Sequence, residues 1–135
     1  MSLDLSLNYQ VTVPDGEDIW VSVSELWELN GSDCHHNITH NLGKMAAEAN
    51  LYEPLWRPYQ LFNIIDDDEY DAIILAEDIL KHVEKGFEEL KSNPKKYKSY
   101  NPDNGWGTYE SLISFTQKWI KCLKKFPQAR VMSSR

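Results

Sequence analysis

The chain lacks long hydrophobic runs and is short of basic residues. Its longest aliphatic run, from Ala72 to Ala76, has five residues, whereas a helix that crosses a membrane needs ~20. Lys and Arg number 14 against 21 Asp and Glu, which gives the 135 residues a net charge of −7. An acidic total argues against a protein that coats nucleic acid or anionic lipid with its whole surface. The sequence therefore predicts no membrane partner.

Cysteine is also scarce. Cys34 and Cys122 are the only two, 88 positions apart, whereas small secreted domains usually carry a denser cysteine framework. The first residues contain neither the basic segment nor the apolar segment of a secretion signal. We therefore expect a cytoplasmic protein.

The composition predicts one globular domain over residues 1–135. Hydrophobic residues make up 41% of the chain and charged residues 26%, close to the average of globular proteins. A chain of this length is sufficient for one buried core. We expect residues 1–30 to form a β-meander, residues 37–126 to form the helical part, and residues 127–135 to form a short strand or a tail.

The N-terminal segment has the period of a β-strand. Apolar and polar residues alternate from residue 3 to residue 13, so a strand here buries one face and exposes the other. Pro14 and Gly16 then supply turn chemistry, and a second alternating run follows over residues 19–23. We expect a third short strand over residues 25–29 and a loop over residues 30–33. The apolar residues of the first strand are Leu3, Leu5, Leu7, Tyr9, Val11 and Val13.

The middle of the chain has the period of helices. Apolar residues recur at spacings of three and four from residue 38 to residue 49, which predicts a main helix. Asn37 or Thr39 is its expected N-cap, and Asn50 lies just past its C-terminus. A short helix is expected over residues 59–63, because Pro58 suits the first helical position.

Two longer helices are predicted after this stretch. One runs over about residues 68–92 as a continuous apolar stripe, with the acidic residues 66–71 at its N-terminus, where the helix dipole favours negative charge. The other starts after a Thr108 cap and ends before Pro127. The fold class is therefore α+β, an N-terminal antiparallel hairpin or meander packed against about three main helices.

Residues 33–41 concentrate groups that bind metal ions, with one thiol and three imidazoles. On a helix that began early, His36 and His40 would face the same way, and Cys34 would approach from the loop. A structural zinc site needs four ligands, usually as pairs on two elements, and the sequence has no second pair. A Cys34 nucleophile with His36 or His40 as base is a further alternative. We predict no metal and no cofactor, with Cys34, His36 and His40 as weak metal candidates.

Charge is distributed unevenly along the chain. Residues 1–93 hold 19 acidic and 5 basic residues, a net −14, whereas residues 94–135 hold 2 acidic and 9 basic residues, a net +7. Lysines interleaved with aromatics are typical of nucleic-acid binding, but lysines also complement a helix dipole and an acidic remainder of the fold. We favour the second explanation, because the total is acidic. The lysines that hint at nucleic acid are Lys95, Lys96, Lys98, Lys121, Lys124 and Lys125.

The chain resembles small uncharacterised proteins of bacteria and their phages in three blocks, which occur in the same order. They are residues 37–42 (NITHNL), 55–58 (LWRP) and 104–110 (NGWGTYE). The resemblance spans about residue 37 to the C-terminus and implies no activity. It does imply that the blocks form either a shared site or a shared structural joint.

These blocks favour a small non-catalytic binding module with a protein or small-molecule partner. Trp and Arg side chains would then rim a pocket for a planar or anionic ligand. The rival is an enzyme that uses His40 as general base in that pocket. A packing role competes with both, in which Trp106 plugs the core at the start of the last helix. The candidate surface consists of Asn37, His40, Asn41, Trp56, Arg57, Trp106 and Tyr109.

Overall fold

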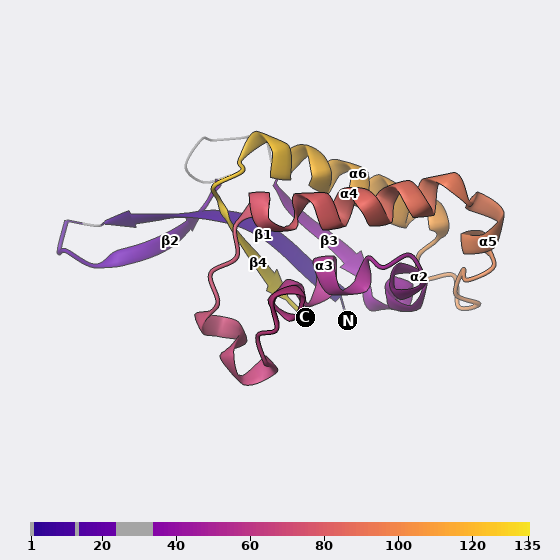
Figure 1. Cartoon of the computed structure of the whole chain (residues 1–135), viewed down its shortest axis with the longest axis horizontal. Coiled ribbons are helices and arrows are strands. Elements are labelled where there is room, and N and C mark those ends of the chain that lie inside the picture. Colours follow the sequence, from indigo (N-terminus) through magenta and orange to yellow (C-terminus); the bar gives the residue numbers. More distant parts are fainter. Residues whose placement is uncertain (1, 13, 24–33) are drawn as a thin grey trace.

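The fold is an antiparallel sheet covered on one face by two long helices (Figure 1). A computed structural model describes residues 2–12, 14–23 and 34–135 of the chain. The arrangement confirms the predicted α+β class. The strand expected over residues 25–29 and the loop expected over residues 30–33 lie outside the described residues.

β1 (Ser2–Thr12) is the central strand, and three other strands pair with it in antiparallel fashion. β2 (Asp18–Ser22) pairs with its C-terminal half, β3 (His35–Thr39) with its N-terminal half, and β4 (Arg130–Ser134) with its middle. The turn between β1 and β2 is the one predicted, and Gly16 there has a φ of +92°, which glycine adopts at no steric cost. The C-terminal residues, expected as a strand or a tail, form a strand.

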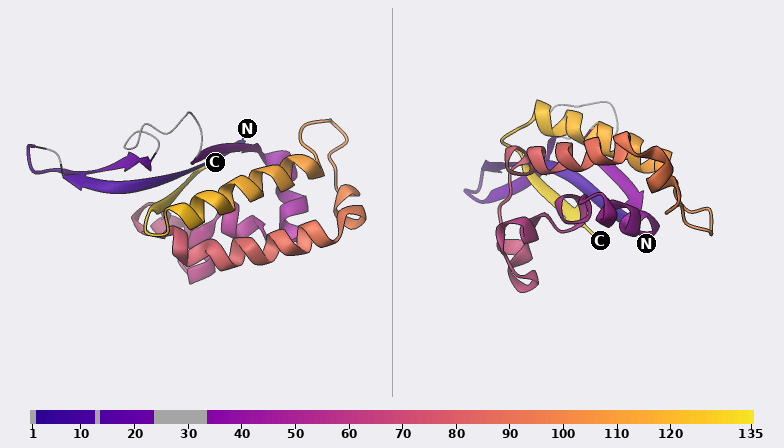
Figure 2. Two further views of the ribbon diagram at one scale, coloured as in Figure 1. Left: turned by 90° about the horizontal axis from the view of Figure 1, so that it is seen from above. Right: turned by 45° about the vertical axis from the view of Figure 1, so that its right-hand side comes forward.

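Alternation along β1 divides the sheet into an inner and an outer face. Leu3, Leu5 and Leu7 are fully buried on the inner face, as the sequence predicted. Asp4 lies between them in the alternation and therefore belongs to the outer face. The side chains of β2 are not fully buried, and Ile19 is 41% exposed. The reason is that the β1–β2 hairpin extends beyond the helical layer (Figure 2).

α6 (Tyr109–Lys125) is the last helix, and it begins where the sequence predicted. The Thr108 hydroxyl accepts a hydrogen bond from the Ser111 backbone nitrogen at 3.1 Å, so the predicted N-cap is confirmed. Its buried face includes Leu112 and Trp119. This face packs against α4 and β3.

α4 (Ala76–Ser92) begins later than predicted. The acidic residues expected at its N-terminus form a separate 3₁₀ helix, η3 (Asp66–Asp71). The chain between the two is extended because Leu75 forms a β-bridge with Arg130. The Asp78 carboxylate accepts from the Leu75 backbone nitrogen at 2.9 Å and so fixes the helix start.

The helix predicted from Asn37 is wrong at its beginning, because residues 35–39 form β3. Asn37 pairs with Asp4 of β1, and tertiary strand pairing overrides the helical spacing. Thr39 is the true cap and accepts from the Asn41 backbone nitrogen. The segments that follow are η1 (His40–Leu42) and α2 (Gly43–Glu48). Asn50 has a φ of 60° just past the helix, as predicted.

Three short helical segments complete the helical part. α3 (Tyr52–Trp56) leads into η2 (Pro58–Phe62), a 3₁₀ helix with the predicted proline at its first position. α5 (Pro94–Lys98) follows α4 and was not predicted. Among the described residues, no helix is both long enough and apolar enough to cross a membrane.

Cys34 and Cys122 form a disulfide, which the sequence analysis did not predict. Their Cα atoms are 5.6 Å apart, within the usual range for a disulfide. The bond joins the residue before β3 to the second half of α6, and both cysteines are buried. It therefore cross-links the sheet to its helical cover.

The acidic and basic parts of the chain pack on each other. Lys124 Nζ of α6 lies 3.3 Å from the Glu84 carboxylate of α4, and Lys96 Nζ lies 3.9 Å from that of Glu89. Several lysines that hinted at nucleic acid are thus engaged within the fold. Each pair is exposed and contributes at most about 1 kcal/mol to the free energy of unfolding. The main effect of the arrangement is that the basic and acidic parts of the chain partly neutralise each other.

Candidate functional site

The three sequence blocks meet at a packed joint, which we define as Thr39, His40, Leu42, Trp56 and Gly107. The Trp56 Nε1 donates a hydrogen bond to His40 Nδ1 at 2.8 Å, which links the first block to the second. Gly107 of the third block lies so close to the first that an added Cβ would be 2.8 Å from Thr39 Cγ2 and 2.9 Å from Leu42 Cγ. Only glycine fits there, and its φ of +96° favours glycine as well.

Trp56 belongs to the core and is not part of a pocket rim. Its side chain is 1% exposed and stacks on Tyr52 with ring centroids 5.4 Å apart. Its carbonyl accepts a hydrogen bond from Arg135 at 3.1 Å. The second block is therefore a structural element of the joint.

His40 is held in a state that does not suit a general base. Burial lowers its pKa, and the positive charge of Arg135 contributes in the same direction. Because Nδ1 accepts from Trp56, the neutral ring carries its proton on Nε2. The lone pair that a base needs is already used by Trp56.

The other candidate residues of the three blocks do not line one common pocket with Trp56. Tyr109 is buried, and its hydroxyl donates to the Leu90 carbonyl at 2.7 Å. Asn41 donates to the Thr39 hydroxyl and supports the cap. Trp106 is 68% exposed, so the expectation that it plugs the core is wrong. Gly107, the next residue, packs against Thr39 and Leu42 of the first block instead.

The three weak metal candidates also separate. Cys34 is in the disulfide, which leaves no thiol for a metal or for nucleophilic attack. His36 lies with its Nε2 3.6 Å from Cys122 Sγ and its ring edge-on to Trp119. His40 is bonded to Trp56. Within the ranges that the structure describes, no three His, Cys, Asp or Glu side chains are grouped as metal ligands.

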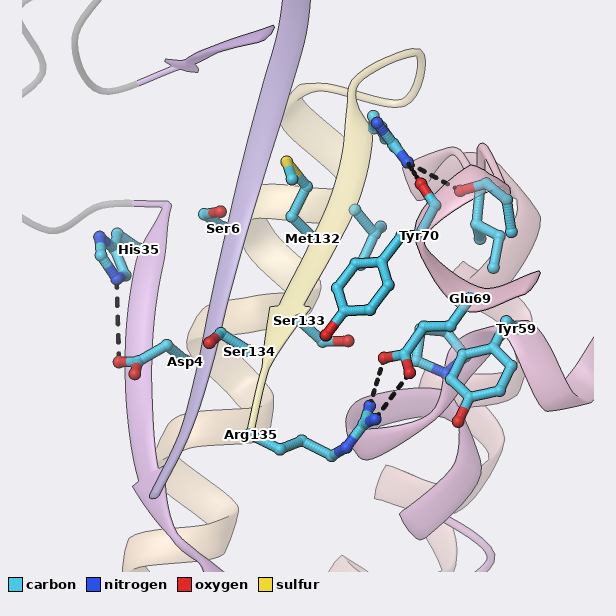
Figure 3. Close-up of a pocket in the computed structure, with 15 residues that line it drawn as sticks. Asp4, Ser6, His35, Tyr59, Glu69, Tyr70, Met132, Ser133, Ser134 and Arg135 are labelled. Carbon is cyan, nitrogen blue, oxygen red and sulfur yellow. Dashed lines mark hydrogen bonds and ion pairs between the residues drawn. The ribbon is translucent and has the colours of Figure 1, made fainter. Parts of the chain in front are cut away.

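A groove of about 710 Å³ lies on the outer face of the sheet (Figure 3), and its Arg135 end adjoins the joint through the bond from Arg135 to the Trp56 carbonyl. Its size falls in the usual range for ligand sites. The sheet forms its floor, and the segment from η2 to the bridge before α4 forms its wall. We call it the sheet groove. Its lining comprises Asp4, Ser6, His35, Pro58, Tyr59, Glu69, Tyr70, Ala72, Ile74 and residues 130–135.

The floor is polar because of the strand alternation. Ser6 of β1 is paired with His35 of β3 and with Met132 of β4, so all three project to the same face. Asp4 and Ser134 form the next pair along. Most hydrophobic residues of these strands face the core, so the groove floor consists mainly of serine hydroxyls, the Asp4 carboxylate, the His35 imidazole and the Met132 thioether.

An ion pair between the chain's last residue and η3 fixes the lower part of the wall. The Arg135 guanidinium binds the Glu69 carboxylate through two bonds of 2.6 and 2.7 Å (Figure 3). Bidentate pairs of this kind fix orientation as well as distance. The bonds to Glu69 also raise the pKa of Arg135. This part of the wall is therefore held in place before any ligand binds.

A second network fixes the wall from behind. The Tyr59 hydroxyl donates to Asp66 at 2.7 Å and accepts from Arg57 Nη1 at 2.9 Å. The bonds from Tyr59 and Gln60 lower the pKa of Asp66, whereas burial raises that of Tyr59. Arg57, a predicted site residue, thus supports the groove from outside its lining.

Arg130 lines the groove at the start of β4, at the opposite end of the strand from Arg135. Its Nη2 donates to the Tyr70 and Ala72 carbonyls at 3.1 and 3.0 Å, and its guanidinium lies 4.8 Å from the centre of the Trp20 ring. These bonds tie β4 to the wall. Beside them the Tyr70 side chain, 86% exposed, extends over the groove (Figure 3).

The groove contains serines, a histidine and the carboxylates of Asp4 and Glu69, but not in a catalytic arrangement. His35 Nε2 lies 3.9 Å from Asp4 Oδ1, which is beyond hydrogen-bond length. Among the described residues, no serine hydroxyl is hydrogen-bonded to His35. Asp4 instead accepts from Asn37 at 2.8 Å. The arrangement offers contacts for a ligand without an activated nucleophile.

Comparisons with protein-family models, with curated proteins and with solved structures find no match for this chain. None of the seven residues predicted as the candidate surface lines the groove, although Pro58 of the second block does. The alternation along β1 did predict a polar outer face. The sequence near Tyr70 and Met132 does not predict that they line a site. Met132 reaches the outer face through the pairing of β4 with β1, and Tyr70 is held beside it by the bond from Arg130.

Proposed function

We propose that the protein is a small non-catalytic binding module and that the sheet groove is its binding surface. The observation that carries the proposal is an open groove of about 710 Å³ in which exposed apolar side chains stand over a polar floor. Tyr70 is 86% exposed and Met132 40% exposed. Such mixed linings are typical of sites that bind a protein segment or a small molecule.

The preformed wall supports the same proposal. The Arg135–Glu69 pair and the Tyr59–Asp66 bond hold the segment in place before binding. Preorganisation lowers the entropy lost on association. A rigid, partly apolar groove therefore suits recognition better than chemistry that needs a mobile base.

The rival enzyme has less support. It requires a free lone pair on His40, and Trp56 donates to that atom. It also requires His40, Arg57 and Trp106 to line one cavity, and none of them lines the sheet groove. We propose in addition that chains with the three blocks share the joint as a structural feature.

The test is capture from a native lysate of the source organism. Immobilised protein is compared with Met132→Trp, which places a larger side chain in the groove, and with Lys118→Gln, an exposed control on α6. Captured proteins and small molecules are identified by mass spectrometry. We expect partners that the wild type and Lys118→Gln retain and that Met132→Trp loses by about tenfold or more, since several contacts of about 1 kcal/mol are lost together.

Equal capture by Met132→Trp would show that the groove is not the binding surface. Thermal unfolding of each variant shows whether the substitution has changed the fold. Capture of a small molecule that is released in altered form would favour the enzyme. In that case, loss of turnover in His40→Gln would assign the reaction to the joint.

For the location, we propose the cytoplasm on the ground that one cysteine pair is not the dense framework of a small secreted domain. The disulfide weighs against this, because reducing compartments keep thiols free. Alkylation under denaturing conditions in freshly lysed cells decides between them, because both cysteines are buried in the folded protein. Labelling of Cys34 and Cys122 without reductant supports the cytoplasm, and protection from labelling contradicts it.

A further inference from the structure

Arg130 is a buried cation in the sheet groove that has no carboxylate partner in the described part of the chain. It is 9% exposed, and its Nε has no hydrogen-bond acceptor among the described residues. Its Nη2 donates to two backbone carbonyls. Buried charges are normally paired, because an unpaired one is costly to remove from water.

The other two arginines of the chain differ from Arg130. Arg135 makes a bidentate pair with Glu69, and Arg57 Nη1 lies 3.5 Å from Asp66. Both are more exposed than Arg130, with 22% and 28% of their side chains accessible. The most deeply buried guanidinium is thus the one without a counter-ion in the described residues.

The described residues around Arg130 do not supply that counter-ion within ion-pair distance. Glu69 is the carboxylate of the groove wall, and Arg135 already binds both of its oxygens. Asp4 lies four positions along β1 from Asn8, the cross-strand partner of Arg130, which is about 13 Å in an extended strand. The Trp20 ring offers a π-face, which attracts a cation but does not neutralise it.

Apolar side chains stand beside the guanidinium. The Tyr70 carbonyl accepts from Arg130, so the exposed Tyr70 ring belongs to the same end of the groove. Met132 is two positions along β4 and projects to the same face. A ligand at this end would meet a cation at one point and apolar surface next to it.

We propose that the Arg130 end of the sheet groove binds the oxyanion of an aromatic carboxylate or phosphate, whose ring lies between Tyr70 and Met132. This rests on the proposed function, because it names the ligand class of the same groove. The oxyanion accepts from guanidinium N–H groups that the two carbonyls do not use. A guanidinium suits both planar carboxylate and phosphate oxygens.

The experiment is an NMR titration of the full-length ¹⁵N-labelled protein with four small probes. Benzoate and phenyl phosphate carry the oxyanion on a ring and distinguish the two sources of negative charge. Benzamide is the neutral control, and benzylamine is the cationic one. The signals to follow are the Arg130 Nε–H correlation and the backbone amides of residues 70–72 and 130–132.

We expect benzoate or phenyl phosphate to shift these signals saturably and to bind about tenfold or more tightly than benzamide, the factor of one charge-assisted hydrogen bond. In Arg130→Gln this preference is expected to disappear. Because Arg130 also ties β4 to the wall, Met132→Trp serves as a second variant. It keeps the guanidinium and should abolish the shifts by filling the space for the ring.

The outcomes separate the two proposals. Equal binding of benzoate and benzamide in the groove, or tighter binding of benzylamine, overturns the anion site and leaves the groove as a binding surface. Shifts from both anions that persist in Arg130→Gln also overturn it. If no probe shifts a groove signal and capture is unchanged by Met132→Trp, both proposals fail.

Discussion

The joint and the sheet groove differ in the sequence segments that form them. The joint draws on three short blocks that are unusual locally, and its Trp56 and Leu42 are 1% and 0% exposed. The groove draws on ordinary serines, two tyrosines and a methionine from distant segments, and its Tyr70 is 86% exposed. Trp56 and Tyr109, two residues that looked functional in the sequence, are buried in the core.

The difference shows what a local motif reports. In the Gly-Trp-Gly run, Gly107 permits a positive φ and a close contact with the first block. In the Leu-Trp-Arg-Pro run, Pro58 fixes its own φ. Both runs therefore report the steric requirements of packing. A groove has looser requirements, since its lining side chains need only leave the space between the sheet and the wall open. It arises from strand pairing and from a wall that stays open, and neither leaves a local pattern.

The largest expected effect contrasts one aromatic residue from each region. Trp56→Ala should lower the free energy of unfolding by about 4 kcal/mol, because it empties a buried site and leaves His40 without its donor. Tyr70→Ala should change it by less than about 0.5 kcal/mol, because the ring is exposed. Urea unfolding of both variants measures this. Similar losses would remove the distinction between joint and groove.

The disulfide lies on the packed side of the sheet. Replacing Cys34 and Cys122 by Ala should cost about 3 kcal/mol, because the bond closes a sequence separation of 88 residues. Wild-type protein in reductant should show the same loss in urea unfolding. The NMR signals of Tyr70 and Met132 should keep their positions. Unchanged stability in reductant contradicts a structural role for the cross-link.

Two glycines of one loop offer a matched pair. Gly107→Ala should cost about 3 kcal/mol, because its φ is +96° and the new Cβ would meet Thr39 and Leu42. Gly105→Ala should cost only about 1 kcal/mol, because its φ is +75° but nothing lies within 4 Å. Thermal or urea unfolding of both gives the difference. Equal costs would mean that Gly107 is not packed against the first block.

The smallest expected effect is a pH dependence from the joint. Because burial lowers the pKa of His40 below its ordinary 6.5, the unfolded chain binds a proton more readily than the folded one. The stability from this group is complete above about pH 6.5 and is lost as the pH falls below it. Melting temperatures from pH 8 to pH 5 should fall less for His40→Gln. An equal fall in His40→Gln and in the wild type would contradict this origin of the pH dependence.

Much of the fold could be predicted where the signal is local. Alternation predicted β1, and caps predicted the start of α6 and the residues flanking α2. The helix expected from Asn37 failed because pairing with β1 decides the state of residues 35–39. The predicted start of α4 was wrong because Leu75 forms a β-bridge with Arg130, 55 positions away in the sequence.

The candidate site was less predictable for the same reason. The polar face of β1 could be predicted, since it follows from a period of two. The groove also requires β4 from the end of the chain and a wall held by Arg135. Nothing in the local sequence around Tyr70 or Arg130 specifies that these residues meet.

The most direct measurement is a screen of chemically diverse fragments by ¹⁵N–¹H NMR on the full-length protein. It maps every binding position without assuming a ligand. We predict that the shifted amides of the hits cluster on the sheet groove, at residues 70–72 and 130–134, while Thr39, His40 and Gly107 stay in place. Hits that cluster on the joint, or that avoid the groove, would contradict the account.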